Sequence, residues 1–171
     1  ALLNDAEAEV RVMAASNISK MCALLGKEKI VSKILSATQR LVTDSSENAR
    51  ASLAGVINNV ASVLGRNDTV THLLPMLLLL LRDETADVRL NIISNLSVIN
   101  QVVGVELLSQ SLLPAIVDLS GDAKWRVRFA IIQYIPQLAE QMGKPLFNEK
   151  LSDLSLNWLG DDVYTVRRAA A

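Results

Sequence analysis

Two stretches of the sequence decide the fold: Asp83-Glu-Thr-Ala-Asp-Val-Arg89 and Asp122-Ala-Lys-Trp-Arg-Val-Arg128, which stand 39 residues apart. Each begins with Asp and ends six residues later with Val-Arg. The same pattern recurs at the same period along the whole chain, once with Ala in place of Val. Its acidic and basic positions are Asp5 and Arg11, Asp44 and Arg50, Asp83 and Arg89, Asp122 and Arg128, and Asp161 and Arg167. A fixed period of this length predicts a repeat architecture.

Apolar residues on both sides of each Asp follow helical spacing. Before Asp83 and Asp122 they include Leu73, Leu74, Leu77, Leu80 and Leu81, matched by Leu112, Leu113, Ile116 and Leu119. After them come Val88, Ile92, Leu96, Ile99 and Val103, matched by Val127, Ile131, Ile135, Leu138 and Met142. A glycine column, formed by Gly26, Gly65, Gly104 and Gly143, then ends each second helix. The sequence therefore predicts an all-α fold, an α-solenoid of antiparallel helix pairs.

The glycine column also predicts the division into repeats. We expect a second helix at 1–25, complete repeats at 26–64, 65–103 and 104–142, and a repeat truncated in its second helix at 143–171. The ends carry apolar residues, including Leu2, Leu3 and Val166, where a terminal repeat normally has a polar outer face. We therefore expect a longer parent protein on both sides.

Composition excludes several classes of function. The 171 residues are 50% hydrophobic and carry a formal net charge of −1, so we expect a folded soluble protein without the positive field that nucleic acid or an anionic membrane requires. The single cysteine, Cys22, and the single histidine, His72, cannot supply a disulfide or a zinc site. The longest apolar run is too short to span a bilayer. We expect no cofactor, no metal and a reduced, intracellular environment.

The recurring Asp and Arg suggest general acid/base chemistry only at first sight. Catalysis needs one converging pocket, whereas these residues repeat along a line. We interpret them as a structural ladder, in which the Asp accepts backbone N–H groups at a helix start and the Arg bridges to a neighbouring carboxylate or carbonyl. No arrangement typical of an enzyme is present, so we expect a non-enzymatic protein.

Several other residues have structural interpretations. Pro75 and Pro114 sit early in the first helix of their repeats, whereas Pro136 lies within a second helix and predicts a kink. Trp158 and Cys22 share columns with small or apolar residues and should be buried. We expect His72 at a solvated surface. Asn58, Asn91, Asn95 and Asn100 do not share one column, and they give only a weak indication of a peptide-binding array.

The last two inter-helix turns differ from the others. The first three are small, polar and acidic, but the turn after Asp122 contains Lys124, Trp125 and Arg126, and the turn after Asp161 contains Val163 and Tyr164. Trp125 and Tyr164 occupy the same column in neighbouring repeats, and Trp, Tyr and Arg are enriched at binding hot spots. These five residues are therefore candidates for partner binding. The alternative is that both rings lie on their own helices as local caps.

The repeat pattern resembles the HEAT repeat over the whole chain. Three strings, Asp87-Val-Arg-Leu-Asn-Ile-Ile-Ser-Asn-Leu96, Leu108-Ser-Gln-Ser-Leu-Leu-Pro-Ala-Ile-Val117 and Asp122-Ala-Lys-Trp-Arg-Val-Arg128, resemble the scaffold A subunits of protein phosphatase 2A. The resemblance implies a non-enzymatic horseshoe, of which this chain is an internal fragment. It implies that Lys124, Trp125 and Arg126 contact the phosphatase catalytic subunit and that Val163 and Tyr164 continue this surface. A regulatory subunit of the B type would bind earlier repeats.

A second hypothesis stays open at this stage. Nuclear transport receptors of the importin kind, and other protein-binding adaptors, are also built from HEAT repeats. A receptor of basic signals would need an acidic row along the second helices, and these helices carry few carboxylates. The expected location is the cytoplasm, with the nucleus as a second compartment.

Overall fold

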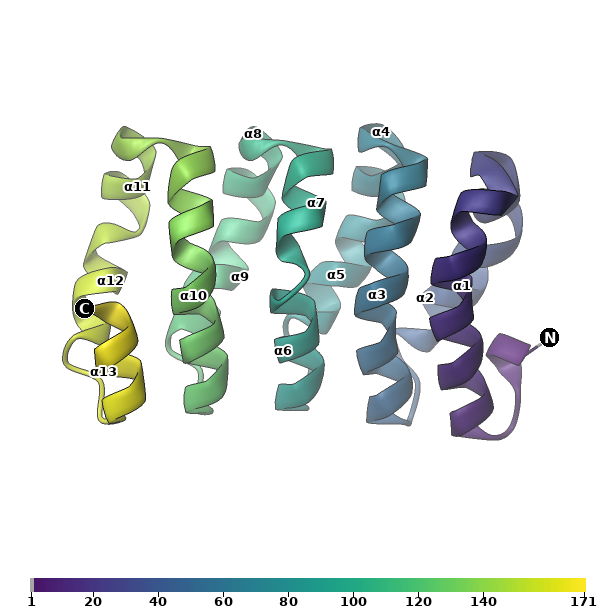
Figure 1. Ribbon diagram of the computed structural model, residues 1–171, viewed down its shortest axis with the longest axis horizontal. Helices are drawn as coiled ribbons and strands as arrows, with labels where there is room; N and C mark the ends of the chain where they lie inside the picture. The colour runs from purple at the N-terminus through teal and green to yellow at the C-terminus, as the bar shows by residue number, and fades with distance from the viewer. Residues whose placement is uncertain (1) are drawn as a thin grey trace. The chain divides into compact units, whose positions relative to one another are not determined.

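The structure is a computed structural model that describes residues 2–171, apart from the side chains of Ser19, Ala23, Val105, Leu108 and Ser109. The predicted first segment, 1–25, therefore includes one residue, Ala1, outside the described chain. The described part is helical and contains no strand, which confirms the all-α prediction (Figure 1). It forms two compact units, Ala1–Val103 (unit 1) and Gly104–Ala171 (unit 2). The finer division into five repeats stays a prediction.

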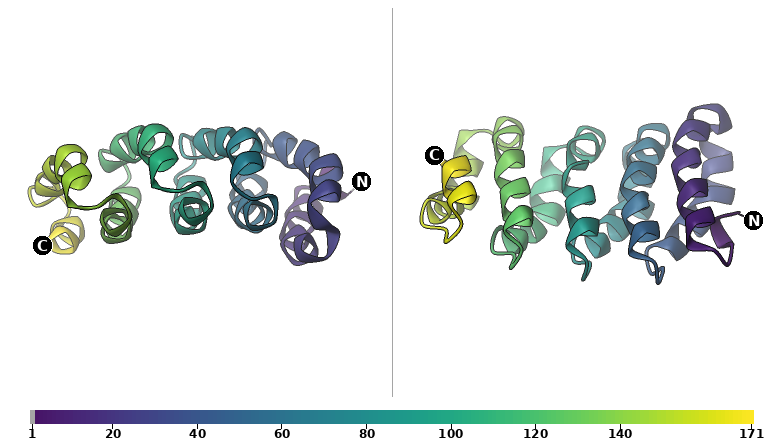
Figure 2. Two further views of the ribbon diagram at one scale, coloured as in Figure 1. Left: turned by 90° about the horizontal axis from the view of Figure 1, so that it is seen from above. Right: turned by 60° about the horizontal axis from the view of Figure 1, so that its bottom comes forward.

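Unit 1 contains the helix pairs of the N-terminal part of the chain. After a 3₁₀ turn at Leu2–Asn4, its elements are α1 (Ala8–Lys29), a π-helical turn (Ile30–Ile34), α2 (Leu35–Leu41), α3 (Glu47–Leu64), α4 (Arg66–Asp68), a second π-helical turn (Thr69–Leu73), α5 (Leu74–Leu80), α6 (Ala86–Ile93) and α7 (Leu96–Val103). The second helices α1, α3 and α6–α7 lie side by side in one layer, and the first helices lie behind them (Figures 1 and 2).

Unit 2 repeats this arrangement. Its elements are α8 (Val105–Leu107), a π-helical turn (Leu108–Leu112), α9 (Leu113–Ser120), α10 (Trp125–Met142), α11 (Lys144–Lys150), α12 (Ser152–Trp158) and α13 (Tyr164–Ala170). The second helices α10 and α13 are neighbours, and the first helices α9 and α11–α12 form the other layer. Each second helix begins directly after the turn that carries the recurring Asp.

The core consists of the repeated apolar columns. The first-helix residues Leu73, Leu77 and Leu80 and the second-helix residues Val88 and Ile92 are buried, as are their counterparts one repeat later. Burial of these side chains is the main favourable term in the stability of such a stack. The predicted inward faces are confirmed.

The glycine column marks a change of direction in the chain. Gly26, Gly65, Gly104 and Gly143 all have positive φ, between 72° and 83°. Gly65 and Gly143 are the C-caps of α3 and α10, and each donates its backbone N–H to the carbonyl four residues earlier. Gly26 has non-helical dihedrals inside α1, so the last residues of α1 already belong to the next first helix. Only glycine adopts this left-handed geometry without steric cost.

The prediction of one continuous second helix after Asp83 is wrong. The helix is interrupted at Ser94–Asn95, between α6 and α7. Ser94 Oγ donates to the Leu90 carbonyl and Asn95 Nδ2 to the Asn91 carbonyl, so polar side chains compete for the helical acceptors. In addition, Asn95 Oδ1 accepts a 2.7 Å hydrogen bond from Asn58 Nδ2 of α3. The break is therefore held by a contact with the neighbouring repeat.

The prolines have a milder effect on helix continuity. Pro75 and Pro114 are the second residues of α5 and α9, early in the first helix as predicted, where a missing N–H is tolerated. The π-helical turn before them is not a consequence of proline, since the equivalent turn at Ile30–Ile34 is followed by Leu35 and Ser36. The exposed Pro136 lies inside α10, which runs through it from Trp125 to Met142. The predicted kink at Pro136 stays a prediction.

Candidate protein-binding site

Each inter-helix turn is organised by its recurring Asp. The carboxylate of that Asp accepts the backbone N–H two residues later, at distances of 2.8–3.0 Å, in all five turns. This Asx-type turn fixes the residues that precede the second helix. The side chains at the start of the helix therefore project from a turn that a hydrogen bond already orders, which lowers the cost of ordering it on binding.

The recurring Arg joins each turn to the next within a unit. Arg11 makes a bidentate contact with Asp44, Arg50 with Asp83, and Arg128 with Asp161, with N–O distances of 2.7–3.0 Å. Each of these arginines also donates Nη1 to the backbone carbonyl of the Asp in its own turn. Arg89 and Arg167 make the same bond to the Asp83 and Asp161 carbonyls. The planar fork of arginine suits this double role.

The ladder perturbs the ionisation of its members. A hydrogen bond from Arg11 lowers the pKa of Asp44, and one from Arg128 lowers the pKa of Asp161. Burial by itself would raise the pKa of Asp83, but the hydrogen bonds from Arg50 and the Thr85 backbone outweigh it, so this pKa is also lowered. The same pairing raises the pKa of the three guanidinium groups. Both partners are therefore charged at neutral pH, and neither is poised for acid/base chemistry.

Trp125 is the first residue of α10 and is half-buried. Its ring and that of Phe129 form a T-shaped pair, with centroids 6.4 Å apart, and the guanidinium carbon of Arg126 lies 5.1 Å from the centroid of the Trp125 ring. Lys124, the N-cap, and Arg126 are exposed. This turn therefore presents one aromatic face that is held by its own helix and flanked by two cations.

Tyr164 occupies the equivalent first position of α13 and is 65% exposed. The guanidinium carbon of Arg167 lies 5.9 Å from its ring centroid. Val163, the N-cap, is half-buried. An exposed ring of this size at a fixed position is typical of a contact surface rather than of a packed core.

Two contacts hold these turns together within unit 2. Arg128 of α10 forms an ion pair with Asp161 in the turn before α13. This bond links the first turn of α10, which carries Trp125 and Arg126, directly to the turn that carries Val163 and Tyr164. In the other layer, the buried Nε1 of Trp158 donates a 3.0 Å hydrogen bond to the Ser120 carbonyl. The five candidate residues Lys124, Trp125, Arg126, Val163 and Tyr164 therefore lie on adjacent turns that share one support.

The local-cap alternative accounts for part of this arrangement. Trp125 does contact its own helix through Phe129 and Arg126, whereas Tyr164 is largely exposed, with the cation of Arg167 over its ring. Sequence reasoning missed Phe129 and Arg167 as members of the two clusters. Their spacing, four residues after Trp125 and three after Tyr164, is the spacing at which helical side chains meet and could have indicated both.

The remaining candidates behave as structural residues. Trp158 and Cys22 are buried, as predicted, and burial raises the pKa of the Cys22 thiol, which disfavours a nucleophile. His72 is half-buried rather than fully solvated. Among the described side chains, no group of three metal-ligating residues is brought together, and no helix in the described range 2–171 is long and apolar enough to cross a bilayer.

Comparisons with known proteins identify the fold and the family. A search of the curated proteins gives no match. A computationally designed armadillo repeat protein for modular peptide recognition is similar in structure, with a TM-score of 0.62, 24% identity and coverage of 99% of this chain and 76% of that one. A second designed armadillo repeat protein, described in complex with the peptide (KR)4, has a TM-score of 0.61 and 23% identity over 99% of this chain and 76% of that one. The model of PPP2R1A-like HEAT repeats matches residues 1–65 and 67–143, so the chain belongs to the PPP2R1A-like HEAT repeat family.

Proposed function

We propose that this chain is part of a non-enzymatic scaffold that binds and positions the catalytic and regulatory subunits of a serine/threonine protein phosphatase of the 2A type. The family match and the helical-repeat fold support a protein-binding adaptor. The assignment to a phosphatase rests on the sequence strings around Asp87–Leu96 and Asp122–Arg128. In this role the protein works in the cytoplasm and the nucleus and needs no cofactor.

One observation carries the site assignment. Unit 2 presents two aromatic rings, Trp125 and Tyr164, at the first positions of neighbouring second helices, each with a guanidinium over its face. Rings supported in this way lose little conformational entropy on binding, and their apolar faces add buried area. The catalytic subunit is the proposed partner of Lys124, Trp125, Arg126, Val163 and Tyr164.

The charge of the exposed groups indicates the chemistry of the contact. Lys124 and Arg126 point to solvent beside Trp125, so a complementary surface would offer carboxylates around an apolar pocket. The regulatory B-type subunit is assigned to the turns of earlier repeats. The alternative of a nuclear transport receptor has less support, because the described second helices of unit 1 carry their carboxylates Glu9, Glu47 and Asp87 in the first turn rather than in a row along the helix.

Binding of purified phosphatase 2A catalytic subunit to the full chain and to the variant Trp125→Ala/Tyr164→Ala tests this proposal. We expect the double variant to bind at least about tenfold more weakly, because truncation of aromatic hot spots typically costs 2 kcal/mol or more. Leu79→Ala, which removes a 62% exposed apolar side chain from α5, is the matched control and should bind like the parent chain.

Circular dichroism of each variant separates binding from folding. Equal helicity with selective loss of binding supports the contact. Absence of binding by the parent chain, or an equal affinity of the parent and the double variant, would contradict the proposal. A double variant that loses helicity together with binding would show that the two rings have a structural role.

A further inference from the structure

A second surface lies in unit 1. Like the first surface it lies at the beginning of the second helices, close to the inter-helix turns, but it is hollow and acidic rather than aromatic and basic. A groove of about 510 Å³ opens between α1, α3 and α6. Its floor and walls come from Ala8, Val12 and Met13 of α1, from Ala51 and Ser52 of α3, and from Asn91 of α6. None of the residues of the proposed phosphatase contact takes part in it.

The sequence explains why the groove forms at this point. Seven residues after the recurring Asp, the second helices carry Val12, Ala51, Leu90 and Phe129 in successive repeats. The smallest of these, Ala51, stands where the next repeat has a leucine. The following position is Ser52, whose hydroxyl donates to the Ala49 carbonyl of its own helix. The floor is therefore apolar, because the Ser52 hydroxyl already donates its hydrogen bond within α3. Met13, which is 62% exposed, forms an apolar wall.

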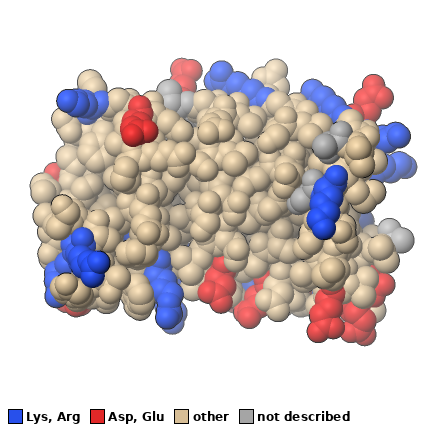
Figure 3. Space-filling model, in the orientation of Figure 1, with Lys and Arg blue, Asp and Glu red and all other residues tan. Residues whose placement is uncertain are grey.

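The rim of the groove is acidic. Glu9 lines it directly, and the exposed Glu7, Glu47, Glu84 and Asp87 belong to the same turns or to the first turns of the same helices. The arginines of these turns, Arg11, Arg50 and Arg89, donate to backbone carbonyls of the turns. Carboxylates accordingly dominate the lower edge of unit 1, at the right of the view from the side of the second helices (Figure 3).

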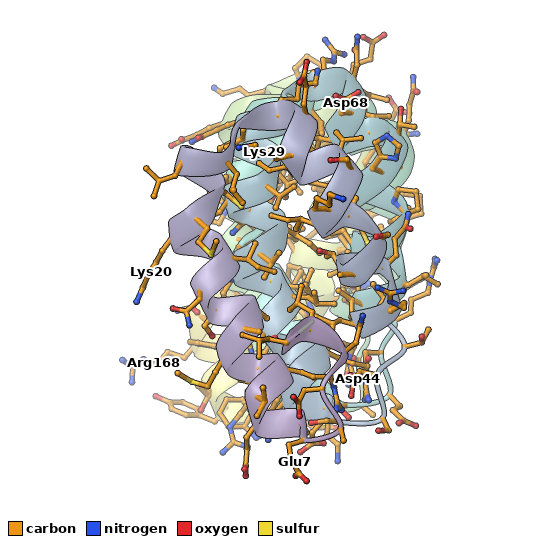
Figure 4. The ribbon with its side chains drawn as sticks, turned by 90° about the vertical axis from the view of Figure 1, so that its right-hand side faces the viewer. Glu7, Lys20, Lys29, Asp44, Asp68 and Arg168 are labelled. Atoms are coloured by element: carbon orange, nitrogen blue, oxygen red, sulfur yellow. The ribbon has the colours of Figure 1, made fainter. Side chains whose placement is uncertain are left out.

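At the opposite end of the helix pairs of unit 1, basic residues outnumber acidic ones. Lys27, Lys29, Lys33 and Arg66 lie there with Glu28 and Asp68. Figure 4 shows Glu7 and Asp44 at one end of unit 1 and Lys29 and Asp68 at the other. The exposed cations near the acidic end, Arg40 at the end of α2 and Arg82 after α5, belong to the first helices, which form the other layer. The acidic field is thus confined to the layer that contains the groove.

Polar groups suited to a peptide backbone flank the apolar floor. The exposed Asn48 lines the groove, and Asn91 uses one amide hydrogen on the Asp87 carbonyl, which leaves its other N–H and its Oδ1 for a ligand. The lining residues come from three successive second helices. A ligand that touches all of them must extend across the helices rather than along one.

We propose that this groove binds an extended basic segment of a partner protein, with one apolar side chain inserted between Val12, Met13 and Ala51 and Lys or Arg residues beside Glu9 and Asp87. Charge complementarity selects the basic partner, the apolar floor selects the anchor, and the two asparagines bind its peptide groups. The surface adds a partner defined by its basic and apolar chemistry, and its occupation is independent of whether the catalytic subunit binds unit 2.

The test uses the full chain and a fluorescent peptide with a central leucine. On each side of the leucine the peptide has one glycine followed by two lysines. We expect saturable binding in fluorescence anisotropy that weakens with added salt. Ala51→Leu should weaken it at least about tenfold, because the new side chain fills the space of the anchor. Glu9→Gln should weaken it several-fold and reduce its salt dependence.

Matched controls isolate the groove. Ser62→Leu places the same side chain at an exposed position of α3 three turns away, and Glu28→Gln removes an exposed carboxylate at the other end of α1. Neither should change the affinity. A peptide with serine in place of leucine should bind at least about tenfold more weakly, and one with glutamates in place of lysines should not bind.

Three outcomes would overturn the proposal. The first is absence of saturable binding. The second is equal affinity for the leucine and serine peptides or for the parent chain and Ala51→Leu, since either shows only diffuse attraction to acidic residues. The third is a dimer of the parent chain in light scattering that Ala51→Leu abolishes, which would make a second copy of this chain the occupant.

Discussion

The same three columns of the repeat build surfaces of different character in the two units. Three and four residues after the recurring Asp, unit 1 has Ala8 and Glu9 in α1, and unit 2 has Trp125 and Arg126 in α10. Seven residues after it, Ala51 in α3 leaves a groove, whereas Phe129 in α10 supports the Trp125 ring. The comparison teaches that the Asp–Arg ladder and the apolar columns keep the packing of the helix pairs the same from repeat to repeat. The residues at the variable positions between them determine the chemistry of each surface and therefore the partner that it can bind.

If the shared columns carry stability, the largest effect should come from truncation of Trp158 in unit 2. This side chain is 4% exposed, and its Nε1 donates to the Ser120 carbonyl, whereas its counterpart in unit 1 is Leu80. We expect Trp158→Ala to lower the free energy of unfolding by about 4 kcal/mol. Trp158→Leu, which copies the residue of unit 1, should lose about half as much, because it restores apolar volume but leaves the carbonyl without its donor. Urea denaturation of the full chain measures both, and similar losses would contradict the role assigned to volume.

Removal of a ladder arginine should have the next largest effect. Arg50→Met leaves the buried Asp83 without its partner, and we expect a loss of about 3 kcal/mol in the free energy of unfolding. Arg128→Met in unit 2 should cost less, because Arg50 also donates to Thr85 Oγ1 and no such third contact accompanies Arg128 in the hydrogen bonds described for unit 2. The double variant Arg50→Met/Asp83→Asn, which removes the unpaired charge but keeps an oxygen acceptor for the Thr85 N–H, should regain part of the loss. A double variant less stable than Arg50→Met would contradict this account.

Acid should weaken the ladder in both units. The pKa values of Asp44, Asp83 and Asp161 are lowered in the folded chain, so their contribution to stability is fully present above the unfolded value of about 3.9 and is lost as pH falls through the folded values. Thermal unfolding between pH 7 and pH 2.5 should show a falling midpoint below about pH 4. Asp44→Asn should start lower at pH 7 and fall less steeply. A midpoint that rises on acidification would show that the sign is wrong.

The smallest effect should come from the helix break that distinguishes α6–α7 from the continuous α10. Ser94→Ala removes an exposed hydroxyl that competes for a helical carbonyl, and we expect a gain of up to about 0.5 kcal/mol. Asn95→Ala should instead cost about 1 kcal/mol, because the buried Asn58 loses its acceptor. Hydrogen exchange of the amides at 94–96 reports on the break. If Asn95→Ala is as stable as the parent chain, the Asn58 contact does not hold the interruption.

Part of the binding surface could be read from the sequence, and part could not. Trp125 and Tyr164 stand out because they depart from a repeated column, and both lie at the first position of a second helix. The hollow beside Ala51 could not be predicted, because it depends on the distance between α1 and α3 and on the side chains that fail to fill it. The Ser94–Asn95 break was missed for a related reason: its second anchor, Asn58, lies 37 residues away in the chain.

The sequence by itself determined the period, the helix pairs, the buried columns and the glycine turns, because helical periodicity and glycine geometry are local properties that every repeat displays again. Only the tertiary structure decided that Arg11, Arg50 and Arg128 pair with the Asp 33 residues ahead while they also bind the carbonyl of their own turn. It also decided which unit bears an acidic groove and which bears supported rings. Contacts between repeats depend on how neighbouring helices pack, and no single period of the sequence contains that information.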